Sequence, residues 1–69
     1  MYKVGVLLLD GFALMSYASL VEPFRAANFL GNEKLYDVVH LTEKKLGAFS
    51  SSGLRVQADY TLGDFPELD

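Results

Sequence analysis

The side chains that could do chemistry gather at three places along the chain. Asp10 and Gly11 follow an unbroken apolar run, residues 4–9, which is typical of a buried parallel strand. In open α/β sheets ligands bind beyond the carboxyl ends of the strands, so we expect binding or catalysis at this junction. Asp10 could hold a ligand or act as an acid. It could equally be a turn residue that bonds to its own backbone, with Gly11 at a positive φ.

Serine residues supply the second and third candidate sites. Ser16 stands where a helix is expected to begin, so its hydroxyl could bind a ligand or cap the helix. The cluster Ser50-Ser51-Ser52-Gly53 could bind an anion through its backbone amides, although such clusters also form plain turns. Neither interpretation is excluded by the sequence at either place.

His40 is the single histidine of the chain and lies between two apolar residues. A metal site needs three or more ligands, and no Asp, Glu or Cys stands at ligand spacing, so we interpret His40 as a half-buried structural residue. Neither GxGxxG nor GxxxxGK occurs, which argues against a dinucleotide site or a P-loop. We expect no metal and no other cofactor.

The elements that must position these residues follow from the spacing of apolar side chains. Residues 3–9 are predicted as a strand and residues 14–29 as a helix that ends at Gly31. Pro23 allows one kinked helix, or an irregular first turn with the regular helix starting near Pro23. The apolar period continues through Pro23 without a phase break, which favours the kinked helix. The predicted inner face consists of Tyr17, Leu20, Val21, Phe24 and Ala27.

A second strand is predicted at residues 36–42, so the first two strands and the helix form a right-handed parallel βαβ unit. Leu54, Val56 and Ala58 alternate with polar residues and predict a short strand with one wet face. Residues 60–69 contain a glycine, a proline and several acids, and we interpret them as a connection.

Length and composition limit what the chain can be. It has 69 residues, of which 51% are hydrophobic and 22% charged, as in a globular protein with at most one small domain. No cysteine is present to supply a disulfide or a thiolate. The elements above cannot cover both faces of the first strand, so we expect the chain to be the start of a larger open α/β domain.

The charge of the chain excludes some partners. Its formal net charge is −3 and its basic residues are scattered, which argues against nucleic-acid binding by this segment. The longest apolar run is far shorter than the roughly 20 residues of a membrane helix, and no signal-peptide pattern follows Met1. We therefore expect a cytoplasmic protein that does not bind membranes.

The string DGFALMSYASLVEPFRAANFL, residues 10–30, resembles the class I glutamine amidotransferase-like domain of GlxA-type AraC-family transcription regulators. These regulators form a branch of the superfamily that contains the PfpI peptidases. The resemblance covers essentially the whole chain, including SSSGLRVQADYTL at residues 50–62. It implies an α/β, flavodoxin-like sandwich with a parallel sheet, in which residues 1–69 are the N-terminal part of one domain. The rest of that domain and a C-terminal helix-turn-helix domain are expected to follow.

The resemblance also implies a site and a function. In the enzymatic relatives a glutamate after the first strand supports a cysteine later in the chain, and Ser16 is the matching residue here. Serine cannot share a proton with a thiol as a carboxylate does, which favours a sensor without catalytic activity. Such a sensor binds a small-molecule effector, forms a homodimer and contacts DNA only through its C-terminal domain. The residues placed near the pocket are Asp10, Gly11, Phe12, Ser16, Ser51 and Ser52.

The alternative is an enzyme of the PfpI-like superfamily. It would be a cysteine hydrolase or a glyoxalase-like enzyme, and its nucleophile would lie after residue 69. The sequence beyond that residue would distinguish the two hypotheses, because the enzyme needs a cysteine on a strained turn and the regulator needs a helix-turn-helix segment.

Overall fold

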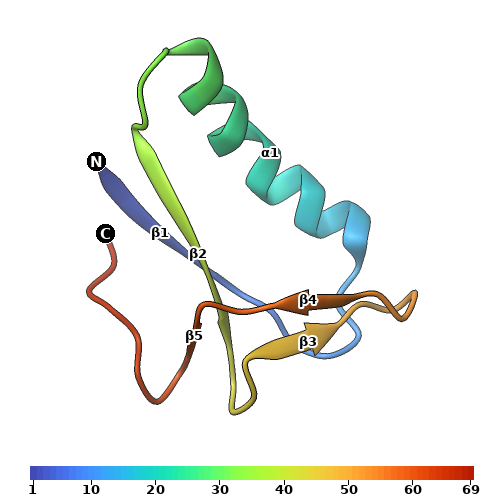
Figure 1. Ribbon diagram of the computed structural model, residues 1–69. Coiled ribbons are helices and arrows are strands. Elements are labelled where there is room, and N and C mark those ends of the chain that lie inside the picture. Colours follow the sequence, from blue (N-terminus) through green and yellow to red (C-terminus); the bar gives the residue numbers. More distant parts are fainter.

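The chain opens with a strand, a helix and a second strand that form a parallel βαβ unit. The computed structural model describes residues 1–69. Strand β1 (Tyr2–Leu7), helix α1 (Leu14–Leu30) and strand β2 (Tyr36–Thr42) follow one another, and β1 lies parallel to β2. Helix α1 crosses one face of the two strands (Figure 1). The predicted unit is confirmed, although β1 ends two residues earlier than expected.

Helix α1 runs without interruption through Pro23. The prediction of a single helix is therefore confirmed, and the alternative of a regular helix starting near Pro23 is wrong. The helix ends at Gly31, as predicted, but Gly31 keeps a right-handed φ of −77°. The residue with a positive φ is Asn32, at 56°. Asparagine tolerates this region because its short polar side chain reduces the steric cost.

A small apolar cluster holds α1 on the sheet. Val6 of β1 and Leu8, just after β1, are each 4% exposed and pack with Ala48. Tyr17 and Val21 of α1 lie against this cluster. Burying an aliphatic side chain of this size contributes about 2 kcal/mol, so these contacts are the main force that fixes the start of α1 over β1.

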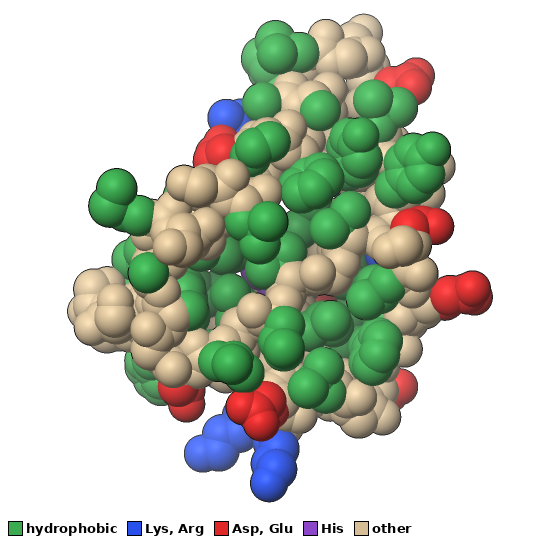
Figure 2. Space-filling view, turned by 180° about the vertical axis from the view of Figure 1, so that it is seen from behind, with side chains coloured by type: hydrophobic (Ala, Val, Ile, Leu, Met, Phe, Trp, Pro, Cys, Tyr) green, Lys and Arg blue, Asp and Glu red, His purple; other side chains and the backbone are tan.

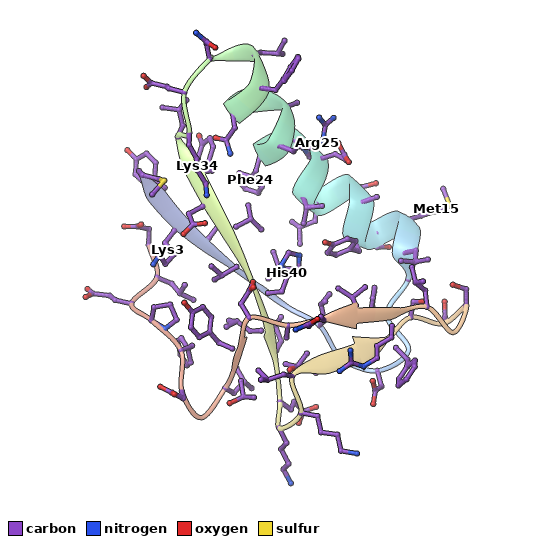
Figure 3. All side chains as sticks on the ribbon, viewed as in Figure 1. Lys3, Met15, Phe24, Arg25, Lys34 and His40 are labelled. Atoms are coloured by element: carbon purple, nitrogen blue, oxygen red, sulfur yellow. The ribbon has the colours of Figure 1, made fainter.

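The outer side of α1 faces away from the strands. Figure 3 shows Phe24 pointing from α1 toward the sheet, and Met15 and Arg25 pointing away from it. Leu20 was expected on the inner face, yet 52% of its surface is exposed. Leu20 still lies on the side of the strands, because it lines a hollow there together with Val6 and Leu8.

Three short strands complete the fold. Strand β3 (Gly47–Phe49) pairs antiparallel with β4 (Arg55–Gln57), and β5 (Tyr60–Thr61) pairs parallel with the end of β2. The main sheet therefore has the order β1-β2-β5. Strand β4 lies within the strand predicted at residues 54–58. Strands β3 and β5 were not predicted, and β5 falls in the segment interpreted as a connection.

The last residues of the chain return to the start of β1. The amide of Asp69 donates a hydrogen bond to the carbonyl oxygen of Lys3 at 3.0 Å, and the Lys3 amide donates to Asp69 Oδ2 at 2.7 Å. Leu68 lies so close to Gly5 that a Cβ atom on Gly5 would be 2.6 Å from Leu68 Cδ1. The two chain ends are accordingly neighbours in Figure 1.

The face of the sheet opposite α1 is only partly covered. Leu68 covers it at the amino end of β1, and Leu41 of β2 is 5% exposed. Farther along, Leu7 and Leu9 each expose 49% of their surface. Figure 2 shows hydrophobic side chains gathered over the middle of the face seen there. The expected uncovered surface is therefore found around Leu7 and Leu9, whereas the tail covers the sheet around Gly5.

Candidate functional site

The turn after β1 lies against the segment around Ser50. Asp10 Oδ1 accepts a hydrogen bond from the Phe49 amide at 2.9 Å, and the Gly11 amide donates to the Phe49 carbonyl oxygen at 2.7 Å. The amide of Ser51 donates to the Phe12 carbonyl oxygen at 2.8 Å. Asp10 thus bonds across to a neighbouring strand, not to its own turn. Gly11 has the expected positive φ, at 90°.

The serine cluster is a turn stabilised by its own hydrogen bonds. The Ser50 side chain lies 2.9 Å from Ser52 Oγ and accepts a hydrogen bond from the Leu54 amide at 3.1 Å. Ser50 is 5% exposed, whereas Ser51 and Ser52 are exposed. Gly53 closes the turn with a φ of 89°. Ser51 and Ser52 therefore face solvent beside the first turn, with the Ser52 hydroxyl already paired.

One hollow of about 300 Å³ lies at the carboxyl ends of β1 and β2. We call it the strand-end hollow. Of the predicted site residues it contains Asp10 alone. The other charged groups around it come from the loop that follows β2. Its full lining is Leu8, Leu9, Asp10, Thr42, Glu43, Lys44, Lys45, Gly47 and Ala48.

A second hollow of about 180 Å³ lies where α1 begins, and we call it the helix-start hollow. It contains Phe12 and Ser16, and most of its lining is apolar. Ser16 makes no cap, because the capping residue of α1 is Ala13 and no side chain bonds to the free amides. The capping interpretation of Ser16 is therefore wrong. The lining consists of Val6, Leu7, Leu8, Phe12, Ala13, Ser16, Tyr17 and Leu20.

Three of the six predicted site residues line the two hollows, and the other three line neither. Asp10 faces the strand-end hollow, and Phe12 and Ser16 face the helix-start hollow. Gly11, Ser51 and Ser52 line neither, although they belong to the two turns that meet between them. Ligand binding by these residues stays a prediction.

A chain of polar contacts connects α1, β2 and Asp59, the residue before β5. The Tyr17 hydroxyl lies 2.6 Å from His40 Nε2, and His40 Nδ1 lies 3.4 Å from Asp59 Oδ2. The same carboxylate accepts a hydrogen bond from the His40 amide at 2.7 Å. Figure 3 shows His40 between the helix and the sheet. Burial first, and then the charges of Asp59 and Glu22, raise the pKa of Tyr17 above its usual value.

Tyr17 and Asp59 were not predicted as partners of His40. The helical period does place Tyr17 on the inner face of α1, and the strand period places His40 on the same side as Val38. These two periodic patterns together could have predicted the contact between Tyr17 and His40. The position of Asp59 depends on the turn between β4 and β5, which no local pattern indicates.

Neither metal binding nor a membrane span is supported by the arrangement of side chains. No group of three or more His, Cys, Asp or Glu side chains is placed to hold a metal ion. Helix α1 does not combine the length and the apolar character needed to cross a membrane.

Sequence comparison relates the chain to transcription regulators. No protein-family model matches it. It is 52% identical over 54 residues to the HTH-type transcriptional regulator GlxA of Rhizobium meliloti, a match covering 78% of this chain and 17% of that protein. It is 39% identical over 67 residues to the HTH-type transcriptional regulator GbdR of Pseudomonas aeruginosa, covering 97% of this chain and 18% of that protein. The chain therefore spans less than a fifth of the length of these curated relatives.

Structure comparison agrees on the fold. A DJ-1 superfamily protein from Agrobacterium tumefaciens superimposes with a TM-score of 0.64 over 94% of this chain and 31% of its own, at 24% sequence identity. The order of strand, helix and parallel strand found here matches the flavodoxin-like fold of that superfamily. In sequence and in fold, this chain resembles the start of the PfpI-like N-terminal domain of GlxA-type transcription regulators.

Proposed function

We propose that this chain is part of the ligand-sensing and dimerisation domain of an AraC-family transcription regulator. The observation that carries the proposal is the sequence similarity to two HTH-type regulators over most of the chain. The effector is a small metabolite that binds at the carboxyl ends of the parallel strands, around Asp10, Gly11, Phe12, Ser16, Ser51 and Ser52. Two hollows at this end of the sheet support that placement.

The proposal includes parts of the protein beyond these residues. The remainder of the PfpI-like domain follows residue 69, and a C-terminal helix-turn-helix domain supplies the DNA contacts. The length of the curated relatives supports this organisation. The net charge of −3 supports the absence of a DNA-binding surface on this segment. Such a regulator acts as a homodimer in the cytoplasm.

The proposed domain is not catalytic. Ser16 occupies the position where enzymes of the superfamily are expected to carry a glutamate, and a hydroxyl cannot replace a carboxylate beside a thiol. The fold shared with a DJ-1 superfamily protein favours the second candidate, a PfpI-like cysteine hydrolase or glyoxalase-like enzyme. That enzyme would need a cysteine nucleophile after residue 69, and mutation of that cysteine would abolish its activity.

The regulator hypothesis is tested with the full-length protein and its own promoter DNA. We expect specific binding whose affinity changes when the correct metabolite is added, because an effector shifts the equilibrium between DNA-binding states. Electrophoretic mobility shift or fluorescence anisotropy at fixed salt would measure it. Absence of specific DNA binding under every condition would contradict the proposal.

The site is tested with Ser16→Ala, and Ser19→Ala serves as the matched control. Both serines are exposed on α1, but only Ser16 lines the helix-start hollow. We expect Ser16→Ala to weaken the effector response about tenfold without lowering the melting temperature, because one hydrogen bond to the ligand is lost. Ser19→Ala should behave as the parent protein. Equal responses in both variants would show that Ser16 is not part of the site.

A further inference from the structure

The outer side of helix α1 carries a row of uncharged side chains that no other element of the chain covers. Its successive members are three or four residues apart, which places them on one side of the helix. Met15 and Leu30 stand at the two ends and expose 84% and 80% of their surface. Figure 3 shows Met15 pointing away from the sheet. We call the row the outer stripe, and it consists of Met15, Ser19, Pro23, Ala26 and Leu30.

The opposite side of α1 already holds the helix on the sheet. Tyr17 and Val21 pack there against the apolar cluster of Val6 and Leu8. A helix with only one covered side normally has charged residues along the other, but the outer stripe has none. No residue of α1 is buried within the chain. An apolar stripe on each of two sides is typical of a helix that packs against a neighbour on both.

The sizes of the side chains follow the same order in both directions along the outer stripe. A long side chain stands at each end, and the smaller Ser19 and Ala26 lie inside them at matching distances. In an antiparallel pair of such helices, Met15 of one copy therefore meets Leu30 of the other, and Ser19 meets Ala26. Small residues near the crossing point allow two helices to approach closely. The stripe is thus complementary to a second copy of itself.

The charges beside the outer stripe have the same property. Arg25 Nε donates a hydrogen bond to Glu22 Oε2 at 2.5 Å, and both side chains are more than half exposed along one border of the stripe. A two-fold axis between residues 22 and 23 keeps this border on the same side in both copies. Glu22 of each copy then lies beside Arg25 of the other, so four charges alternate in sign around the apolar contact. Such an arrangement favours association and fixes its register.

We propose that the outer stripe is the surface through which two copies of this protein pair, with their α1 helices antiparallel around a two-fold axis. The contact is isologous, which means that the same residues of both copies form it. It has an apolar centre and a charged border, as protein interfaces commonly do. The proposal rests on the dimerisation included in the proposed function and names the surface that this dimerisation uses. An unrelated segment could cover the stripe, but its order of side chains would need no such symmetry.

The first test measures the dissociation constant of the full-length dimer by sedimentation over a dilution series. Met15→Lys/Leu30→Lys places like charges opposite each other at both ends of the contact. We expect it to raise the dissociation constant at least about tenfold, because apolar contacts are lost and the lysines repel. Leu46→Lys/Leu62→Lys is the control with the same added charge, since both leucines are exposed outside α1, and it should dimerise as the parent protein does.

The second test examines the antiparallel register. Met15→Glu/Leu30→Lys places opposite charges where Met15→Lys/Leu30→Lys places like charges, so it should dimerise at least about tenfold more tightly than that variant. Met15→Cys/Leu30→Cys should form a disulfide-linked dimer on mild oxidation with diamide, and mass spectrometry should find residue 15 linked to residue 30 of the other copy. Each single cysteine variant should not link at these residues, because the two copies of one residue lie about 22 Å apart.

Two results would overturn the proposal: like-sign and opposite-sign variants that dimerise equally well, or cysteines that link equally well alone and together. Circular dichroism identifies a variant that fails to fold, and the cysteine variants then decide. A protein that dimerises in spite of every change to the outer stripe would keep the proposed function and lose this surface. A protein that stays monomeric at all concentrations would lose the surface and the dimer, while promoter binding would still judge the regulator.

Discussion

At the scale of single residues, Tyr17 joins the helix to the sheet by both polar and apolar contacts. Its ring packs against the cluster of Val6 and Leu8, and its hydroxyl reaches His40 Nε2 at 2.6 Å. His40 in turn faces Asp59. Removing one partner of a partly buried hydrogen bond lowers the free energy of unfolding by more than an average hydrogen bond contributes. The reason is that the remaining polar group loses its partner and stays shielded from water.

We expect Tyr17→Phe to lower the free energy of unfolding by about 1 kcal/mol, because the ring is kept and only the hydrogen bond to His40 is lost. Urea unfolding of the full-length protein at pH 8 measures the change. Tyr2→Phe is the control, since no hydrogen bond of the Tyr2 hydroxyl is found and 60% of Tyr2 is exposed. A Tyr17→Phe protein as stable as the control would mean that the Tyr17–His40 bond contributes nothing.

The raised pKa of Tyr17 gives a second expectation at alkaline pH. Burial, Asp59 and Glu22 hold the folded pKa above the unfolded value, which is about 10. Above that pH the unfolded chain loses the proton first, so the folded state binds more protons and stability falls as pH rises. The stability difference between the parent protein and Tyr17→Phe should therefore narrow between pH 9 and pH 11. Unfolding curves across that range measure it, and a constant difference would contradict the assignment.

At the scale of elements, Asn28 connects the end of α1 to the start of β2. Its Oδ1 accepts hydrogen bonds from the amides of Leu35 and Tyr36 at 2.8 and 2.9 Å, and its Nδ2 donates to the Tyr36 carbonyl oxygen at 2.8 Å. One side chain thus satisfies three backbone groups at the beginning of the strand. These three bonds hold the start of β2 against the end of α1.

We expect Asn28→Ala to lower the free energy of unfolding by about 2 kcal/mol, because three backbone groups lose their partner and only water can replace it. Thermal unfolding of the full-length protein measures it. Asn32→Gly is the matched control: Asn32 has a φ of 56°, which glycine adopts freely, and makes no side-chain hydrogen bond. Equal melting temperatures for the two variants would contradict this role of Asn28.

Replacing Pro23 is expected to stabilise the protein, in contrast to the replacement of Asn28. Pro23 lies inside the helix, is exposed, and cannot donate a hydrogen bond to the Ser19 carbonyl oxygen. Pro23→Ala should therefore raise the free energy of unfolding by about 1 kcal/mol or more, through the added hydrogen bond and the better helix propensity of alanine. Ala26→Ser, at a helical position without this defect, should not stabilise the protein. A loss of stability in Pro23→Ala would mean that α1 depends on a bend at this residue.

Local patterns could predict the longer elements and not the shorter ones. Residues 36–42 were predicted with the bounds observed for β2, and α1 differs from its prediction by one residue. These segments have enough residues to show a period. Strands β3 and β5 have three and two residues, and they exist because distant partners bind them, as Phe49 binds the turn at Asp10. Leu54 was predicted on the covered face of its strand, yet 55% of its surface is exposed.

The sequence could predict where the candidate site lies in the fold, but not all of the residues that line it. The change from a continuous apolar run to a helical period located the turn at Asp10, and parallel sheets bind ligands at that end. The loop after β2 was interpreted as a solvated strand end, yet Lys44 and Lys45 line the larger hollow. That hollow lies where β1 and β2 end and β3 begins, and this arrangement depends on pairing between residues far apart in the chain.

At the scale of the whole molecule, the tail closes the sheet at the end opposite the candidate site. Asp69 forms hydrogen bonds with Lys3 on β1, and Leu68 packs against Gly5. A Cβ atom at residue 5 would be 2.6 Å from Leu68 Cδ1 and 3.0 Å from Leu41 Cδ1, so the ends of these side chains would have to move. Because Gly5 has no side chain, Leu68 of the tail can approach the backbone of β1 at this residue.

We expect Gly5→Ala to lower the free energy of unfolding by about 1 kcal/mol, because the end of Leu68 must move to make room. The Asp69 amide should also exchange faster with solvent. Leu68→Ala in the same background should restore part of the loss, since it removes the clash, and a double-mutant cycle measures this coupling. Strictly additive effects of the two changes would show that the tail does not pack on Gly5.

The parallel pairing of β1 with β2 also sets the order in which the molecule can fold. Every rung of this ladder, from Tyr2 with Tyr36 to Leu7 with Leu41, joins residues separated by the whole of α1 and both of its connections. Chain entropy must be lost before the first rung forms, whereas a helix forms from neighbouring residues in about a microsecond or less. We therefore expect the β1–β2 pairing to form after helix α1. Changes such as Pro23→Ala should speed folding, and the pairing of β5, which depends on β2, should be the last to form.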